Sequence, residues 1–319
     1  MSDIPAISVV IPLYNKESHI ARALSSVLNQ TFQDFEVIVI DDGSTDGGAE
    51  VVRGFRDPRI LLIQQENMGV SAARNKGIQL AIADYIAFLD ADDEWMSCFL
   101  EDVNDMIKKY PFAGAYSTTY RILEANNMIK IPQNAAVPRS SESIIIPNYF
   151  EIISRGDPPV CSSSICVPKD VFLKIGGFLE GKDMGEDIDM WFRIALEYQF
   201  AFIHKIGAIY YRNASNRACR TSKILTNDFP IIKTAKLAIA GGQVSKKNSE
   251  FIKKFVTKIE INTAAANILA GRSKIARQII MNSEYKYYKF SKCKLIILSI
   301  IPHKIVSNLA NIKRTYINI

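Results

Sequence analysis

The sequence predicts an α/β protein in which helices flank a sheet and a basic, mainly helical region follows. Three observations lead to this prediction. From residue 7 to residue 92, short apolar segments suited to buried strands alternate with segments of helical periodicity. The last of these strands, residues 85–89, ends abruptly in acidic side chains. From residue 220 onward the chain holds 19 Lys/Arg and 4 Asp/Glu, whereas the preceding part holds 20 and 29.

The composition is that of a folded protein, with 48% hydrophobic and 23% charged residues. The change in charge along the sequence divides the chain into one domain over residues 1–219 and a basic region over residues 220–319. The amino terminus lacks a basic and apolar leader, and no apolar run reaches about 18 residues, so we expect neither a secretory signal nor a membrane span. The five cysteines lack metal-ligand spacing, which indicates reduced thiols in a cytosolic protein.

The first part of the chain predicts a parallel sheet. We expect strands over residues 7–11, 35–40, 60–63 and 85–89, with helices over about 18–28, 48–55 and 67–81 between them. Ser71 is a candidate cap for the third helix. Right-handed crossovers would make neighbouring strands parallel and bring the loops that follow them to one edge of the sheet.

The pattern becomes less regular after Trp95. We expect helices over residues 99–109, 169–175 and 185–198, and strands over 113–120 and 161–167. Gly176 follows the helix over 169–175 and suits a left-handed cap. The acids at the start of the last of these helices would lie at the positive end of its dipole.

The acidic end of the strand over residues 85–89 is the first candidate site. Asp90 and Asp92 are two residues apart, so on an extended chain both carboxylates face the same side. Ligands bind at the carboxyl ends of parallel strands, and Mg²⁺ or Mn²⁺ takes carboxylate oxygens together with substrate phosphates. The strand end therefore predicts a metal and diphosphate site. The alternative is a solvated acidic loop that caps the helix beginning near Ser97.

The basic region has two interpretations. Apolar residues at helical spacing between 251 and 259 form one face, and most lysines lie off it. Structural packing or homodimerisation would use that apolar face. Binding to an anionic membrane surface is the alternative, and the apolar run over residues 295–301 between lysines supports it.

Five motifs in order resemble glycosyltransferase family 2, over about residues 7–211. They are Ser8-Val9-Val10-Ile11-Pro12-Leu13-Tyr14-Asn15, Val39-Ile40-Asp41-Asp42-Gly43-Ser44-Thr45-Asp46, Asn67-Met68-Gly69-Val70-Ser71-Ala72-Ala73-Arg74-Asn75, Phe88-Leu89-Asp90-Ala91-Asp92-Asp93, and Gly176-Gly177-Phe178 with Gly185-Glu186-Asp187. The resemblance implies a GT-A-type fold, a Rossmann-like mixed sheet flanked by helices. It also implies transfer of a sugar from a nucleotide diphosphate donor to a hydroxyl, with inversion.

The family motifs imply a nucleotide-sugar site. By this resemblance Pro12 and Tyr14 border the nucleotide base and Asp42 recognises it. Its other expected members are Arg74 near the nucleotide, Asp90 toward the ribose and metal shell, and Asp92 as the direct ligand of Mn²⁺ or Mg²⁺. The alternative for Asp42 is helix capping through Ser44, Thr45 and Asp46, and the alternative for Arg74 is a surface ion pair.

Asp187 matches the family's general base, which would take the proton of the attacking hydroxyl. Its neighbour Glu186 and the aromatic Trp95 are candidate acceptor contacts, whereas core packing is the stronger interpretation of Trp191. Many relatives place a histidine after the position of Tyr211, and this chain does not. Arg212, Arg217 and Arg220 are candidate diphosphate contacts instead.

The function expected is that of a metal-dependent glycosyltransferase with a nucleotide-sugar donor, UDP by family frequency, acting in cell-surface polysaccharide biosynthesis such as lipopolysaccharide or capsule assembly. The acceptor would be a saccharide, with a lipid-linked one at the inner face of the plasma membrane explaining the basic region. The alternatives are a noncatalytic binder of nucleotide sugars or nucleic acid. No recognition motif supports nucleic acid, and no Gly-x-Gly-x-x-Gly supports a dinucleotide enzyme.

Overall fold

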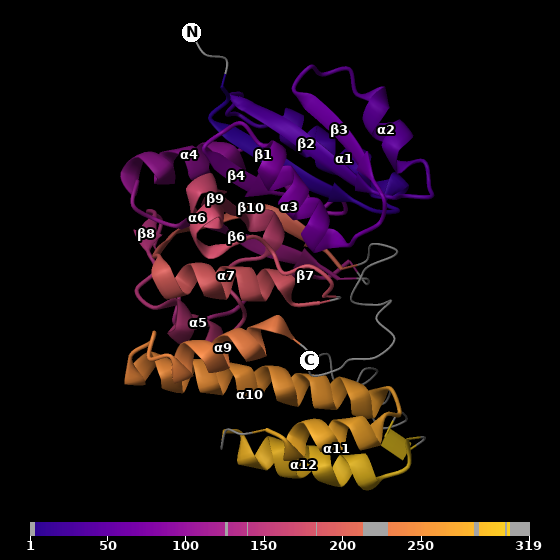
Figure 1. The fold of residues 1–319 in the computed structure, drawn as a ribbon, viewed down its shortest axis with the longest axis vertical. Coiled ribbons are helices and arrows are strands. Elements are labelled where there is room, and N and C mark those ends of the chain that lie inside the picture. The colour runs from indigo at the N-terminus through magenta and orange to yellow at the C-terminus, as the bar shows by residue number, and fades with distance from the viewer. Residues whose placement is uncertain are drawn as a thin grey trace. The chain divides into compact units, whose positions relative to one another are not determined.

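The computed structural model describes residues 4–124, 127–138, 140–182, 184–212, 229–283, 287–303 and 305–306. The chain forms two compact units, Met1–Thr221 and Ser222–Ile319, called here the amino-terminal and carboxyl-terminal units. Figure 1 shows a sheet with helices on both faces in the first and helices alone in the second. Each unit is described by itself.

A mixed sheet organises the amino-terminal unit. Among the described residues it has ten strands in the order β3-β2-β1-β4-β9-β6-β10-β5, with β7 beside β6 and β8 beside β10. The strands are β1 Ile7–Leu13, β2 Phe35–Asp42, β3 Ile60–Gln65, β4 Tyr85–Phe88, β5 Glu94–Trp95, β6 Ala115–Leu123, β7 Ile129–Lys130, β8 Ile144–Ile145, β9 Ile165–Pro168 and β10 Phe200–Tyr211. β3, β2, β1 and β4 are parallel, and β9 runs antiparallel to both β4 and β6.

Helices cover both faces of this sheet (Figure 1). They are α1 Glu17–Leu28, α2 Gly48–Gly54, α3 Val70–Leu80, α4 Phe99–Lys109, α5 Tyr149–Arg155, α6 Lys169–Ile175 and α7 Glu186–Glu197, with a short 3₁₀ turn, η1, at Ser162–Ser164. Alternate residues of β1 pack with α1 and α4 in one buried cluster. On the other face Val10 lies so close to α3 that a Cβ on Gly77 would come within 2.3 Å of it, so α3 needs glycine there.

Aromatic packing fixes the second half of the unit to the first. Phe88, which is next to Val10 in register, lies against Phe172, Phe178 and Trp191 with ring centroids 5.5 to 6.2 Å apart. Trp191 is 2% exposed, which confirms its expected place in the core. This contact brings the start of α7 beside the end of β4.

The predicted α/β class with a basic helical carboxyl-terminal region is confirmed, and two local predictions are wrong. Ser71 does not cap α3: the N-cap is Gly69, whose φ of 90° suits glycine. Residues 162–164 are not a strand: they form η1, and the strand starts at Ile165. The Ser164 side chain bonds back to the main chain of Cys161, which competes with strand pairing.

The carboxyl-terminal unit is helical, as predicted. Its helices are α9 Pro230–Ala240, α10 Lys246–Leu269, α11 Ser273–Met281 and α12 Lys289–Ile300. One buried cluster joins α10, α11 and α12 through residues such as Ile268, Ile279 and Leu295. In the parts of the chain that the structure describes, every helix is too short or too polar to cross a bilayer.

Candidate active site

Loops after β1, β2 and β4 meet at the carboxyl edge of the parallel strands. Asn15 joins the first two: its main-chain N–H donates to Ser44 Oγ at 3.0 Å, and its side chain accepts from Thr45 N at 2.7 Å. Its φ of 51° is a left-handed conformation that asparagine tolerates better than most residues. Lys16 joins the first loop to the third by pairing with Asp92 at 2.7 Å.

Asp42, at the end of β2, is held by the loop that opens α3. Its carboxylate accepts from the main-chain N–H groups of Met68 and Gly69 at 2.9 and 2.8 Å, and from Gln65 Nε2 at 2.8 Å. Asp42 is only 3% exposed. A carboxylate has about four acceptor positions, so these three donors leave about one for a ligand.

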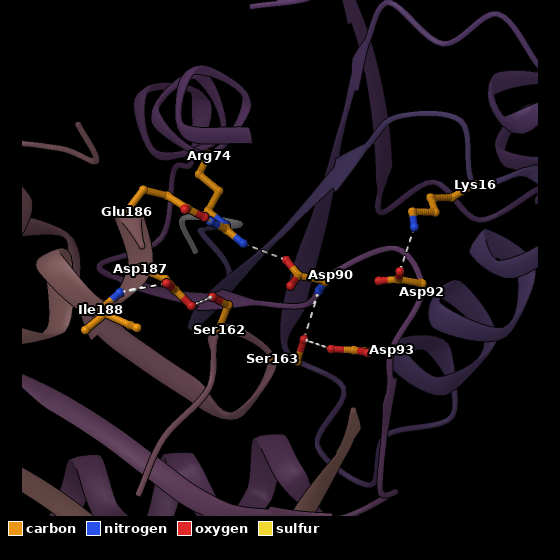
Figure 2. A network of polar contacts seen from close by, with 10 residues as sticks. All are labelled: Lys16, Arg74, Asp90, Asp92, Asp93, Ser162, Ser163, Glu186, Asp187 and Ile188. Atoms are coloured by element: carbon orange, nitrogen blue, oxygen red, sulfur yellow. Dashed lines mark hydrogen bonds and ion pairs between the residues drawn. The ribbon is translucent and has the colours of Figure 1, made fainter. Parts of the chain in front are cut away.

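The acidic end of β4 is divided among three environments (Figure 2). Asp90 pairs with Arg74, and Asp92 pairs with Lys16, with 13% of its side chain exposed. Asp93 is buried and accepts from Ser163 Oγ at 2.5 Å and from Tyr211 N at 3.0 Å. Only Asp90 and Asp92 of this group therefore keep partial exposure at the strand end.

Arg74 connects the end of β4 to the start of α7. Its guanidinium lies 2.8 Å from both Asp90 Oδ1 and Glu186 Oε1, and its side chain is 3% exposed. Figure 2 shows it between the two carboxylates. Both terminal nitrogens are bonded to protein carboxylates, so Arg74 in this conformation links two parts of the protein and does not offer its charge to a ligand.

Asp187 follows Glu186 and faces a different partner. Ser162 Oγ donates to Asp187 Oδ2 at 3.3 Å, and the main-chain N–H of Ile188 donates to Oδ1 at 2.7 Å. Unlike buried Glu186, Asp187 is partly exposed. Of the two adjacent acids, Asp187 is thus the one available to a ligand's proton.

Burial dominates the acid chemistry of the network. It raises the pKa of Asp93 well above the ordinary value, and the charges of Asp92 and Asp90 add to the rise. Burial and then the charge of Asp187 raise the pKa of Glu186, while Arg74 opposes the rise. The pKa of Arg74 is raised: burial lowers it, but Asp90 and Glu186 outweigh burial.

The remaining predicted residues lie in different surroundings. Pro12 and Tyr14 lie at the end of β1 and just beyond it, and Tyr14 is 47% exposed. Trp95 is 3% exposed, packs on Phe99 and donates to Ser163 O, so its ring offers no face to an acceptor and we do not propose it as a contact. Arg212 pairs with Glu124 at 3.0 Å. Arg217 and Arg220 lie outside the described residues.

The residues at the end of β4 could provide some of the ligands of a divalent cation. Among the described residues, no three His, Cys, Asp or Glu side chains converge as a complete metal site. Contrary to expectation, the chain is not extended here: residues 91 and 92 form a turn in which the Asp93 N–H donates to Asp90 O at 2.9 Å. Asp90 and Asp92 each still supply hard carboxylate oxygens, and Mg²⁺ and Mn²⁺ commonly combine one or two of these with phosphate oxygens and water. The donor set therefore suits a cation that arrives with a diphosphate.

Three functional candidates did not come from the sequence: Lys16, Ser162 and Ser163. Lys16 precedes the helix expected over residues 18–28 and receives no role from the sequence, and the serines fall in the strand expected over residues 161–167. The signal that was available is the run of three serines after Cys161, because serine hydroxyls compete with strand pairing by bonding locally. No comparable local signal marks Lys16, whose partner is 76 residues away.

Comparison with solved structures identifies the fold. The structure resembles the crystal structure of S. aureus TarS 1–349 in complex with UDP-GlcNAc, with a TM-score of 0.63, 18% identity, and coverage of 96% of this chain and 91% of that one. A second TarS structure, in complex with UDP, has a TM-score of 0.53. The fold is that of the GT-A glycosyltransferases, as the motifs predicted.

Sequence comparison then points to a family for part of the chain. Residues 8–163 match the model of the family described as Glycosyl transferase family 2. Glycosyltransferase GlyA of Streptococcus pneumoniae serotype 4 is 37% identical over 124 residues, 38% of this chain and 18% of that protein. An uncharacterised glycosyltransferase of Rickettsia conorii is 31% identical over 200 residues, 62% of this chain and 32% of that protein. The chain thus spans about a third or less of the length of these relatives.

Proposed function

We propose that the protein is an inverting glycosyltransferase that moves a sugar from a nucleoside diphosphate donor to an acceptor hydroxyl. One observation carries the proposal: Arg74 bonds Asp90 at the strand end and Glu186 beside Asp187. The strand end proposed to bind the donor and the residue next to the candidate base are therefore joined by one buried arginine. This arrangement supports a reaction centre between β4 and α7.

The proposed reaction is a single displacement. The acceptor hydroxyl attacks the anomeric carbon, its oxygen forms the new glycosidic bond, and the bond from that carbon to the diphosphate oxygen breaks with its electron pair. Asp187 accepts the hydroxyl proton, and Ser162 fixes the direction of the Asp187 carboxylate. Attack opposite the leaving group inverts the anomeric configuration.

The donor is proposed to be a UDP-sugar, held at the edge where Pro12, Tyr14 and Asp42 lie. The ligands bound in the TarS structures, UDP and UDP-GlcNAc, support UDP. Asp92, with Asp90 beside it, would hold Mn²⁺ or Mg²⁺. A bound cation would stabilise the charge that grows on the leaving diphosphate.

The biological setting we propose is assembly of a cell-surface polysaccharide, such as lipopolysaccharide or capsule, at the cytoplasmic face of the membrane. A saccharide attached to a lipid would be the acceptor. The excess of Lys and Arg over Asp and Glu from residue 220 onward supports this setting, because cytoplasmic membrane surfaces are anionic.

Calorimetry with UDP, GDP and TDP tests the donor site. The wild type should bind UDP more tightly with Mn²⁺ than without it, and Asp92→Asn should lose about tenfold or more of the Mn²⁺-dependent affinity, because an amide is a poorer ligand for a hard cation. Asp170→Asn is the control, because the Asp170 side chain is exposed on α6, and it should behave as wild type. Equal metal dependence in wild type and Asp92→Asn would remove Asp92 from the metal site.

Lys16 should compete with the cation for Asp92. Its ammonium is 2.7 Å from Asp92 Oδ2, and the two side chains are 11% and 13% exposed. Lys16→Met keeps a long, unbranched side chain but removes its charge, so Mn²⁺ binding without nucleotide should tighten by about tenfold. Titration followed by electron paramagnetic resonance measures it.

Lys205→Met is the matched control for Lys16, because Lys205 pairs with Asp102 at 2.9 Å away from the strand end. Its Mn²⁺ affinity should equal that of wild type. Unchanged or weaker Mn²⁺ binding by Lys16→Met would show that the Lys16–Asp92 pair and the cation do not compete.

A further inference from the structure

Helix α12 of the carboxyl-terminal unit has one apolar face outward. Phe290, Ile297 and Ile300 are 94%, 62% and 72% exposed, and Cys293 is also exposed. These four residues are three or four positions apart, so they share one face of the helix. We call them the α12 outer face.

The opposite side of α12 is fixed to its neighbours. Leu295 is 8% exposed and lies in the buried cluster that joins α10, α11 and α12. Arg277 of α11 donates to Ser299 O at 2.7 Å, and Lys292 donates to Ser283 Oγ at 2.6 Å. The outward direction of the α12 outer face is thus set by packing of the same helix.

Lysines border this face. At about 100° per residue, Lys289 and Lys294 lie on opposite sides of the stripe that runs from Phe290 to Ile300. Both lysines are exposed, and α11 and α12 contain no Asp or Glu. An apolar stripe between cationic side chains is the pattern of a helix that lies in a membrane interface.

We propose that the α12 outer face docks the protein onto an anionic phospholipid bilayer, with the apolar side chains in the interface and the lysines at the headgroups. α12 has 12 residues, about 18 Å of helix against a hydrocarbon core of about 30 Å, so it would lie along the surface. Charge separates this occupant from a second copy of the chain. In a symmetric pair the same lysines would face each other and repel, whereas anionic lipid neutralises them.

As an account of how the enzyme reaches a lipid-linked acceptor, this inference rests on the proposed function. The docking itself needs neither donor nor catalysis. Binding to vesicles and binding of UDP are therefore measured separately on the same 319-residue proteins, so that failure of one leaves the other intact.

Sedimentation with phosphatidylcholine vesicles, with and without phosphatidylglycerol, tests the docking. The wild type should bind the anionic vesicles and release at high salt. Phe290→Ser/Ile297→Ser should bind about tenfold or more weakly, because two apolar side chains leave the interface. Lys289→Glu/Lys294→Glu should lose the preference for phosphatidylglycerol. UDP binding should be unchanged in both variants.

Phe112→Ser/Leu173→Ser is the control, since it removes two apolar side chains that are 62% and 79% exposed on the amino-terminal unit. It should bind vesicles as wild type does. The proposal is overturned if wild type ignores anionic vesicles, or if Phe290→Ser/Ile297→Ser binds them equally well. It is also overturned if light scattering shows a wild-type dimer that this variant converts to monomer, because the face would then serve self-association.

Discussion

Asp187→Asn should lower sugar transfer by about 10³-fold and leave UDP affinity within about twofold, because only the proposed proton acceptor is lost. The amide has the shape of the carboxylate, and its oxygen can still accept from Ser162 Oγ and from the main-chain N–H of Ile188. Donor binding is proposed to use other residues, Asp42 and Asp92. The effect should therefore fall on turnover, measured as UDP released per enzyme, and not on the KM for the donor.

Glu197→Gln is the control for Asp187→Asn. Glu197 lies at the other end of α7 and is exposed, so the same loss of charge on the same helix should leave turnover unchanged. An Asp187→Asn enzyme that keeps more than about a tenth of wild-type turnover would place the base elsewhere.

Arg74→Met should destabilise the amino-terminal unit by about 3 to 5 kcal/mol, because it leaves two carboxylates without their counterion. Glu186 has 10% of its side chain exposed and Asp90 has 28%, and both are 2.8 Å from the guanidinium. Urea unfolding followed by tryptophan fluorescence measures the change in this unit alone. The chain has two tryptophans, Trp95 and Trp191, and both lie in it.

Two further variants separate the network from a general effect of losing an arginine. Arg53→Met breaks an exposed pair with Glu50 and should change the free energy of unfolding by no more than about 0.5 kcal/mol. Adding Glu186→Gln to Arg74→Met should recover part of the loss, because one of the two unpaired acids becomes neutral. If Arg74→Met unfolds at the same urea concentration as Arg53→Met, the buried network contributes nothing measurable.

Local sequence patterns predicted most of the amino-terminal sheet. Continuous apolar runs located β1, β2, β3 and β4, and α4 and α6 begin and end at the predicted residues. The parallel pairing of β1 with β2 followed from the crossover rule, whereas the pairing of β1 with the distant strand β4 was not predicted. These features depend on residues close together in the chain, which is why one sequence was enough.

The partners within the site were not predictable in the same way. Asp90 was identified from the acidic end of its strand, and Glu186 and Asp187 by resemblance to a family. However, Arg74 meets Glu186 across 112 residues and Lys16 meets Asp92 across 76. Such contacts depend on how α1, α3 and α7 pack around the sheet. Local propensity also failed at Ser162 and Ser163, where side-chain bonds to Asp187 and Asp93 accompany a 3₁₀ turn instead of the expected strand.

The most direct test is release of UDP from UDP-sugars by the 319-residue wild type with Mn²⁺, compared with Asp187→Asn under the same conditions. We predict slow release by the wild type with water as acceptor, faster release when a suitable saccharide is added, and neither in Asp187→Asn. A wild type that binds UDP but releases no more nucleotide than Asp187→Asn from UDP-, GDP- or TDP-sugars would contradict the account. The protein would then be a binder of nucleotide sugars and not a transferase.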